Sequence, residues 1–257
     1  MKIRTRLSVR QFRRLLLQCL YMILLLMCVP VEQAHAQKRT TVTVKTPSPG
    51  KTKEVFEVID GEIKDGSYRR YLNKVLIEAG YYKSGRKDSL WTYYTVRKEP
   101  VATGNYSNDQ RVGYWTFYSR SGRMVQRYDY DADSLIYFDV EEERKSGPAP
   151  AVFPDTSSER MALFIGGYYY MYAILNNYMK YPEEAWLNKQ SAKLLINFIV
   201  DTTGHVTDVK SLNPAGHGFD EEGVRLIRLL DRMWIPAWQG GRKVKMNYRL
   251  PLTFRLE

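Results

Sequence analysis

Residues 191–212 read SAKLLINFIVDTTGHVTDVKSL, and their pattern is the main indication of how the C-terminal part of the chain folds. The apolar residues of its first half occupy alternate positions and share one face of a strand: Leu194, Ile196, Phe198 and Val200. The polar run 201–205 predicts a turn, and residues 206–212 predict a second strand that returns beside the first. The stretch therefore predicts a β-hairpin with one buried face.

Two segments of helical character flank this hairpin. Residues 168–179 carry apolar side chains without β alternation, and Tyr181-Pro182 ends this helix because the residue before a proline is excluded from helical geometry. Pro182 suits the first turn of a short second helix. Residues 220–233 place apolar side chains at helical spacing behind acidic residues, which predicts an amphipathic helix.

The most regular strand pattern lies near the end of the chain, where apolar and polar residues alternate from Val244 to Leu256. The order of elements is thus helix, hairpin, helix and long strand. This order predicts an α+β fold, a three-stranded antiparallel sheet with helices on one face.

The ordered motifs of residues 161–257 resemble the C-terminal domain of TonB-type energy transducers. The motifs that carry the resemblance are Tyr181-Pro182-x-x-Ala185, Phe198-Ile-Val-Asp201-x-x-Gly204-x-Val206-x-Asp208-Val209, Trp234 followed by a proline and Gly240-Gly241, and Leu250-Pro-Leu-Thr-Phe254. One departure is Ala192, where the family usually has a glycine. An alanine fits an ordinary strand position, so the departure does not change the expected fold.

The resemblance implies mechanical coupling. Transducers of this family capture a peptide of a TonB-dependent outer-membrane transporter by adding it as a strand to their own sheet. They transmit force derived from a proton-channel complex of the ExbB/ExbD kind in the inner membrane. Strand addition works because an edge strand presents free N–H and C=O groups in a row.

We expect this edge at Lys243, Val244, Lys245, Met246, Asn247, Tyr248 and Arg249. Pro251, which cannot donate a hydrogen bond to a neighbouring strand, suits an edge position. The family's second contact region matches Tyr178, Lys180, Tyr181 and Pro182 here. The alternative is that these four residues only end the helix and pack in the core.

Residues 55–139 contain a repeat with a spacing of 24 residues. Trp91-Thr-Tyr-Tyr94 aligns with Trp115-Thr-Phe-Tyr118, and Gly80-Tyr-Tyr82 aligns with Gly104-Asn-Tyr106. Each unit predicts a β-hairpin, and the units are expected to stack into one sheet because a single hairpin cannot bury its own face. The pattern resembles MORN-type modules. The aromatic residues form either an exposed binding surface or the core of a thin sheet.

The first 36 residues have the features of a secretory signal peptide. Basic residues end at Arg14, an apolar run occupies residues 15–31, and Ala34-His35-Ala36 places small residues before a cut after Ala36. The alternative is an uncleaved anchor in the inner membrane of a Gram-negative bacterium, although a span usually needs roughly 20 residues. Both alternatives place the remaining chain outside the cytoplasm, as a periplasmic, secreted or membrane-anchored protein. Residues 37–54 and 140–160 are polar and predict linkers.

Composition and missing motifs argue against other classes of protein. The net charge of +11 is partly due to the basic N-terminus, and the remaining excess is spread out, which argues against nucleic-acid binding. Both cysteines lie within the apolar run. His205 and His217 lack the spacing of a metal site, and Asp201 with His205 is typical of a turn. We therefore expect no cofactor, no metal site and no enzymatic activity.

Overall fold

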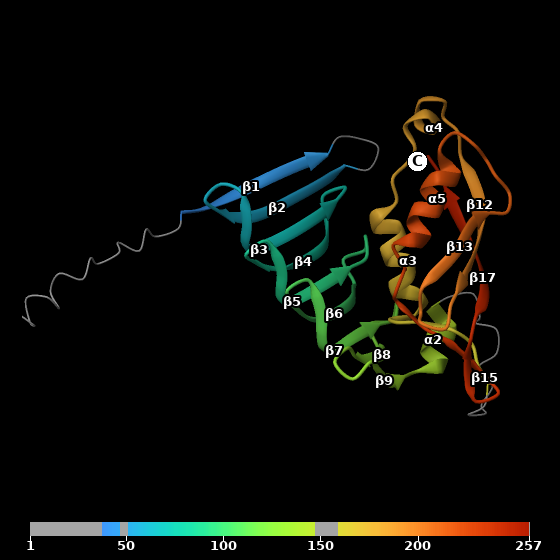
Figure 1. The fold of residues 1–257 in the computed structure, drawn as a ribbon. Helices are drawn as coiled ribbons and strands as arrows, with labels where there is room; N and C mark the ends of the chain where they lie inside the picture. The colour runs from blue at the N-terminus through green and yellow to red at the C-terminus, as the bar shows by residue number, and fades with distance from the viewer. Residues whose placement is uncertain (1–37, 47–50, 147–158, 257) are drawn as a thin grey trace, which may run out of the picture. The chain divides into compact units, whose positions relative to one another are not determined.

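The computed structural model describes residues 38–46, 51–146 and 159–256. The predicted signal peptide or anchor lies outside these residues, as does most of the linker expected at 140–160. Residues 38–257 form one compact unit. The chain enters it through a large sheet and ends in a smaller mixed domain (Figure 1).

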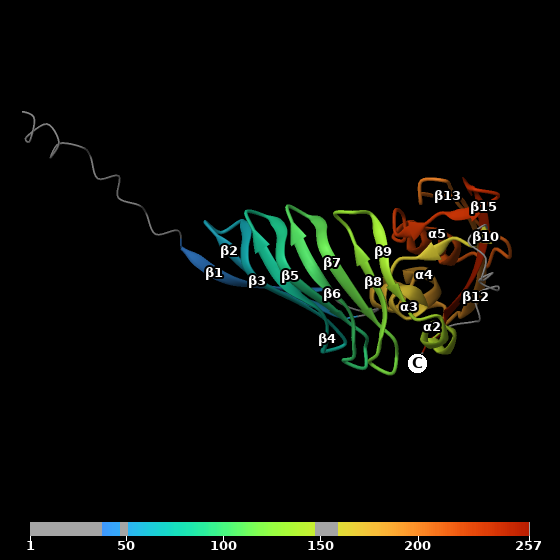
Figure 2. The same ribbon diagram turned by 90° about the horizontal axis from the view of Figure 1, so that it is seen from below.

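The N-terminal sheet has nine antiparallel strands, and each strand pairs with the next one in the chain (Figure 2). The strands are β1 (Arg39–Thr46), β2 (Thr52–Ile59), β3 (Ile63–Leu72), β4 (Val75–Lys83), β5 (Arg86–Tyr94), β6 (Pro100–Ser107), β7 (Gln110–Tyr118), β8 (Met124–Asp129) and β9 (Ser134–Phe138). β1 and the start of β2 occupy residues for which the sequence predicted a linker. Alternating threonine and valine in β1 favour an extended strand, and β1 pairs with β2 along its whole length.

Each repeat places a glycine against the ring of its tryptophan, and this pairing recurs with the spacing of the repeat. Trp91 and Trp115 are both 0% exposed, and each ring lies against a glycine of the strand before it, Gly80 and Gly104 respectively. A Cβ atom on Gly80 would come within 2.1 Å of the Trp91 ring, and one on Gly104 would come within 2.3 Å of the Trp115 ring. Each indole needs the space that only a glycine leaves. The two tryptophans therefore belong to the core, and an exposed binding surface made by them is ruled out.

A cation lies over the central ring of each repeat, four residues before it in the chain. The distances from the cation to the ring centroid are 5.0 Å for Lys64 over Tyr68, 3.9 Å for Lys87 over Trp91 and 4.6 Å for Arg111 over Trp115. Such contacts stabilise a cation that is removed from water. The rings and cations together form one continuous row along the sheet.

The carboxylate partners of these cations stop after the second repeat. Lys64 lies 3.6 Å from Glu54, and Lys87 lies 2.6 Å from Glu78, which follows Glu54 by the repeat spacing. The corresponding third position is Ala102. Arg111 instead donates hydrogen bonds to tyrosine hydroxyls: to Tyr106 at 3.3 Å, to Tyr130 at 2.6 Å and to Tyr170 at 2.8 Å.

Helix α3 (Gly167–Tyr178) packs on the aromatic face of the sheet. The ring of Tyr170 lies 5.2 Å from that of Phe117, and the Asn177 side-chain amide donates to the Tyr94 carbonyl at 2.7 Å. The helix thus closes the core of the sheet. Helix α2 (Val140–Ser146), which lies where the sequence predicted a linker, contacts both α3 and β8.

The C-terminal domain has the predicted three-stranded antiparallel sheet, in the order β13-β12-β17. Its main elements are α3, α4 (Glu183–Leu187), β12 (Ala192–Val200), β13 (Val206–Ser211), α5 (Phe219–Arg228) and β17 (Met246–Phe254). Short strands complete it: β10 (Glu159–Arg160), β11 (Leu163–Phe164), β14 (Trp234–Ile235), β15 (Ala237–Gln239) and β16 (Arg242–Val244). The predicted α+β class is confirmed. The predicted long strand, however, is divided at Lys245 into β16 and β17, because β16 pairs with β15 and β17 pairs with β12.

Candidate functional site: an edge strand and the Tyr-Pro segment

Strand β17 forms one edge of the three-stranded sheet. Its pairing with β12 runs without a register shift from Met246 opposite Val200 to Phe254 opposite Ala192. Within the described ranges, no strand pairs with the other side of β17. The edge therefore presents backbone N–H and C=O groups that an extended partner could satisfy.

The inner face of β17 is anchored in the core. Leu250, Leu252 and Phe254 are buried, whereas the intervening residues are exposed. The Tyr248 ring stacks on Phe198 at 5.7 Å, and its hydroxyl donates to the Ala162 carbonyl. Burial raises the pKa of Tyr248, so this hydroxyl keeps its proton. The strand is thus held from one face while its edge stays open.

The structure divides the predicted docking segment between two ladders. Lys243 and Val244 belong to β16 and pair with Trp238 and Ala237 of β15. Residues 246–249 belong to β17 and pair with β12. Both β16 and β17 are edge strands of the described sheets, so the predicted residues lie at open edges, although not in one continuous strand.

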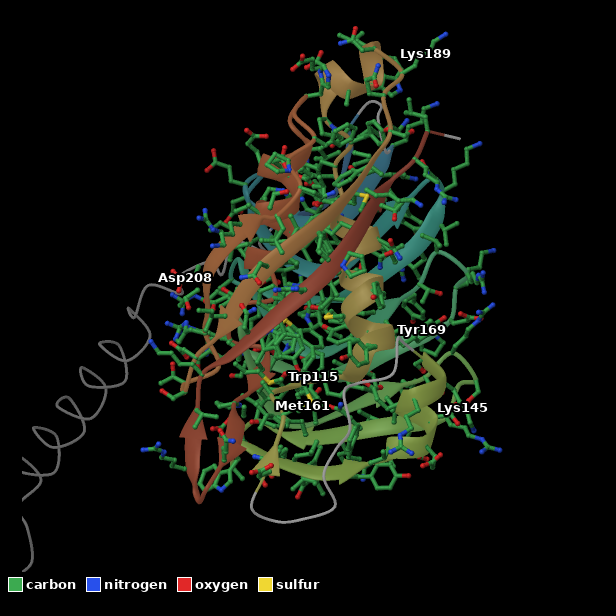
Figure 3. All side chains as sticks on the ribbon, turned by 90° about the vertical axis from the view of Figure 1, so that its right-hand side faces the viewer. Trp115, Lys145, Met161, Tyr169, Lys189 and Asp208 are labelled. Atoms are coloured by element: carbon green, nitrogen blue, oxygen red, sulfur yellow. The ribbon has the colours of Figure 1, made fainter. Side chains whose placement is uncertain are left out.

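The opposite edge, β13, is a poorer template. It is shorter than β17, and its register with β12 shifts between Asn197 and Ile199. Asp208, labelled at the margin of the sheet in Figure 3, has a φ of 51°, which breaks the extended backbone. Irregularities of this kind protect an edge from pairing. The two edges therefore differ, and β17 is the regular one.

Pro251 indicates which backbone groups of β17 point outward. A proline is tolerated in a strand where its nitrogen does not face a paired neighbour. N–H groups of the same parity point in the same direction, so those of Asn247 and Arg249 are expected to face the open side. These two N–H groups are the donors that a docked strand would use.

The Tyr-Pro segment is engaged within the protein. The Tyr178 hydroxyl donates to the Glu78 carboxylate at 2.8 Å, and the Arg70 guanidinium lies 4.3 Å from the centre of the Tyr178 ring. Burial, and then the nearby Glu78 charge, raise the pKa of Tyr178. The Lys180 N–H donates to Glu222 at 2.7 Å. Tyr178 therefore faces the repeat sheet.

The next two residues of this segment, Tyr181 and Pro182, pack in the core and lie at a helix boundary, as the alternative interpretation of the sequence predicted. The Tyr181 ring packs against Phe219 at 5.7 Å and against Phe254 at 6.1 Å, and Pro182 precedes the first turn of α4. Core packing and helix punctuation thus account for Tyr181 and Pro182. Whether any of the four residues also binds a partner stays a prediction.

Sequence reasoning missed the residues of the sheet that meet Tyr178. Glu78 lies 100 positions before Tyr178, so no local pattern connects the two. The only available signal was the recurrence of glutamate at Glu54 and Glu78 with the spacing of the aromatic repeat. That recurrence indicates a repeated position in the sheet, but it does not predict that Glu78 contacts Tyr178.

His205 lies in the turn before β13, and His217 lies beside the first turn of α4. Asp201 accepts hydrogen bonds from the N–H groups of Thr203 at 2.8 Å and of His205 at 3.0 Å, which confirms its role in the turn. His217 contacts Glu184 at 2.9 Å. In the part of the chain that the structure describes, no group of three or more potential ligands could hold a metal ion. In the same part, no helix is long and apolar enough to cross a membrane.

Comparison with known proteins identifies the C-terminal domain. Residues 177–256 match the family model described as the Gram-negative bacterial TonB protein C-terminal. The comparison with curated proteins found no match. The matched range contains the Tyr-Pro segment, the hairpin, α5 and the edge strand, in the order that the sequence motifs predicted; domains of this family lie in the periplasm. Residues 177–256 of this chain are therefore a TonB C-terminal domain.

Proposed function

We propose that this protein is an energy transducer of the TonB family. It docks by β-strand addition to a peptide of an outer-membrane transporter and couples the proton-motive force of the inner membrane to transport, together with an ExbB/ExbD-like complex. The observation that carries the proposal is the open, regular edge of β17 in a domain that matches this family. Force transmission at such an edge needs no catalytic group, so we also propose that the protein is not an enzyme.

The proposal predicts that main-chain hydrogen bonds supply most of the affinity for the transporter peptide. Asn247→Pro removes an outward N–H group and places a ring in the path of the partner, while the bonds to β12 remain. This variant should abolish binding. Asn247→Ala keeps the backbone donor, as does Lys245→Ala, and both should weaken binding only modestly.

The measurement is a titration of the full chain with peptides from the N-terminal segments of the transporters of the same bacterium, followed by backbone amide shifts. We expect the largest shifts along β17. Shifts that instead map to Val206–Ser211 would show that β13 is the docking edge. Binding to Asn247→Pro with the wild-type affinity would contradict strand addition at β17.

The alternative proposal is that this protein is a periplasmic adaptor, which binds peptides or proteins without transducing energy. The observation that favours it is Ala34-His35-Ala36, because cleavage after Ala36 would remove the apolar run through which a transducer contacts its proton-channel complex. Mass spectrometry of the N-terminus in the native host separates the two. A mature end at Gln37 excludes a self-contained transducer, whereas an intact N-terminus in the inner membrane excludes the secreted adaptor.

A further inference from the structure

A cleft lies between the first strands of the repeat sheet and the end of α3. Its volume is about 690 Å³, within the range of roughly 300–1,000 Å³ that is usual for ligand sites. Strands β1 to β5 supply one wall, and residues 177–181 supply much of the other. The cleft shares no residue with β17. It is therefore distinct from the proposed strand-docking edge.

Two polar atoms of the cleft residues have no hydrogen-bond partner. One is Oδ1 of Asn177, a residue that is only 5% exposed. Its side-chain nitrogen donates to the Tyr94 carbonyl, so the oxygen is directed elsewhere. The other atom is Nε of Arg70. Buried polar atoms without partners are rare because each one costs free energy, so a missing acceptor and a missing donor beside one cleft call for an explanation.

The charges of the cleft leave the Arg70 guanidinium available. Glu78 is satisfied by Lys87 at 2.6 Å and by the Tyr178 hydroxyl at 2.8 Å. The carboxylate near Arg70 is Glu54, whose oxygen lies 3.9 Å from Arg70 Nε, too far for a hydrogen bond. The contact of the guanidinium with the Tyr178 ring, 4.3 Å from its centre, is a cation–π contact and not a hydrogen bond to an acceptor atom. Arg70 can therefore accept a carboxylate in the paired geometry that arginine favours.

The other residues that line the cleft favour a ligand with several polar groups over a simple anion. Four residues with side-chain hydroxyl groups, Thr46, Thr52, Tyr68 and Tyr82, are among those that line the cleft. Burial raises the pKa of both tyrosines, so their hydroxyls remain protonated and can donate hydrogen bonds. The cleft thus offers several donors for carbonyl or carboxylate oxygens and, at Asn177, one acceptor for an N–H group.

We propose that this cleft binds the free C-terminal end of a peptide, with its carboxylate on the Arg70 guanidinium and a neighbouring amide N–H donating to Asn177 Oδ1. A peptide end is the ligand that brings a carboxylate and an amide donor together at short range. A simple anion would satisfy Arg70 but would leave Asn177 without a donor.

The test uses the full chain and two probes, acetyl-trialanine with a free carboxylate and the same peptide with a C-terminal amide. We expect saturable binding of the acid with a Kd of about 1 mM or tighter, measured by NMR shifts of the Asn177 side-chain amide. The amide form should bind at least about tenfold weaker, because it loses the charge-assisted hydrogen bonds. Equal binding of the two peptides, or no binding of the acid, would overturn the proposal.

Two variants locate the effect. Arg70→Gln should weaken binding of the acid at least about tenfold, while Arg70→Lys should retain part of it as a point charge. The matched control is Arg69→Gln, because Arg69 is the exposed neighbour on the other face of the same strand. Equal losses for Arg69→Gln and Arg70→Gln, in chains that circular dichroism shows to be folded, would assign the effect to overall charge and reject the site. Asn247→Pro should leave acid binding unchanged, which separates this site from docking at β17.

Discussion

Glu143 of α2 is a buried carboxyl group with an incomplete set of hydrogen bonds. It is 1% exposed; its Oε1 accepts from the Tyr168 N–H at 2.8 Å, and its Oε2 has no partner. Gly167 lies close to this carboxyl group, since a Cβ atom on Gly167 would come within 2.4 Å of Oε2. Burial raises the pKa of Glu143 to about 7, against the opposing effect of the Tyr168 N–H. The packing of α2 on α3 thus favours the neutral carboxyl.

This pKa makes stability fall as the pH rises. Between the usual value of 4.5 and about 7, the folded protein holds a proton that the unfolded chain has released. At 1.36 kcal/mol per pH unit, the whole shift corresponds to about 3 kcal/mol, of which about 2.5 kcal/mol is lost between pH 5 and pH 8. Glu143→Gln cannot ionise. Relative to the wild type, its free energy of unfolding should therefore rise by about 2.5 kcal/mol over that interval.

The assay is urea unfolding of the full chain at pH 5, 6, 7 and 8, followed by tryptophan fluorescence. Glu141→Gln is the matched control, because Glu141 is an exposed residue of the same helix, and its curves should follow the wild type at each pH. Glu142 does not interfere in this range: hydrogen bonds from Ser121 and Ser119 lower its pKa to about 2, so it stays ionised. A difference between Glu143→Gln and the wild type that does not change with pH would refute the reasoning.

Further substitutions test the aromatic core, each by chemical unfolding. Trp115→Ala should lower the free energy of unfolding by about 3–5 kcal/mol, whereas Tyr114→Ala, at a residue that is 60% exposed, should change it by less than about 0.5 kcal/mol; equal effects would contradict a buried Trp115. Gly104→Ala should cost about 1–3 kcal/mol, because its methyl group meets the Trp115 ring, and an unchanged stability would show that the ring can move. Tyr170→Phe should cost about 1.5–3 kcal/mol through the lost bond to Arg111, and a neutral result would mean that water replaces the hydroxyl.

The C-terminal domain could be predicted because its signals are local. Period-two alternation fixed both faces of β12 and of β17, and the proline after Tyr181 ended α3 close to its observed end at Tyr178. The edge position of β17 followed from Pro251 and from the place of this strand at the end of the element order. The break at Lys245 could not be predicted, because alternation continues through it while the pairing partner changes from β15 to β12.

The features that could not be predicted from the sequence were mostly tertiary contacts. The polar composition of β1 concealed a strand whose backbone pairs with β2 along its whole length. The tyrosines of α3 read as an apolar helix face, but nothing near them in the chain indicated that Tyr170 would meet Arg111, or that Tyr178 would meet Glu78. The spacing of the repeat was enough to predict the aromatic core of the sheet. It was not enough to predict that α3 would cover this core, because that contact depends on hydrogen bonds between residues far apart in the chain.

The chain-ordered pairing of the nine strands has a consequence for folding. Every pairing in the sheet joins neighbours in the chain, and proteins rich in such contacts of short sequence separation fold rapidly. The hairpins can therefore form one after another as the chain emerges, N-terminus first. Their aromatic face is covered only when α3 docks, and α3 begins at Gly167, well after β9 ends at Phe138. In that interval the sheet carries an uncovered row of rings, and the partly folded chain is then most prone to associate with other copies.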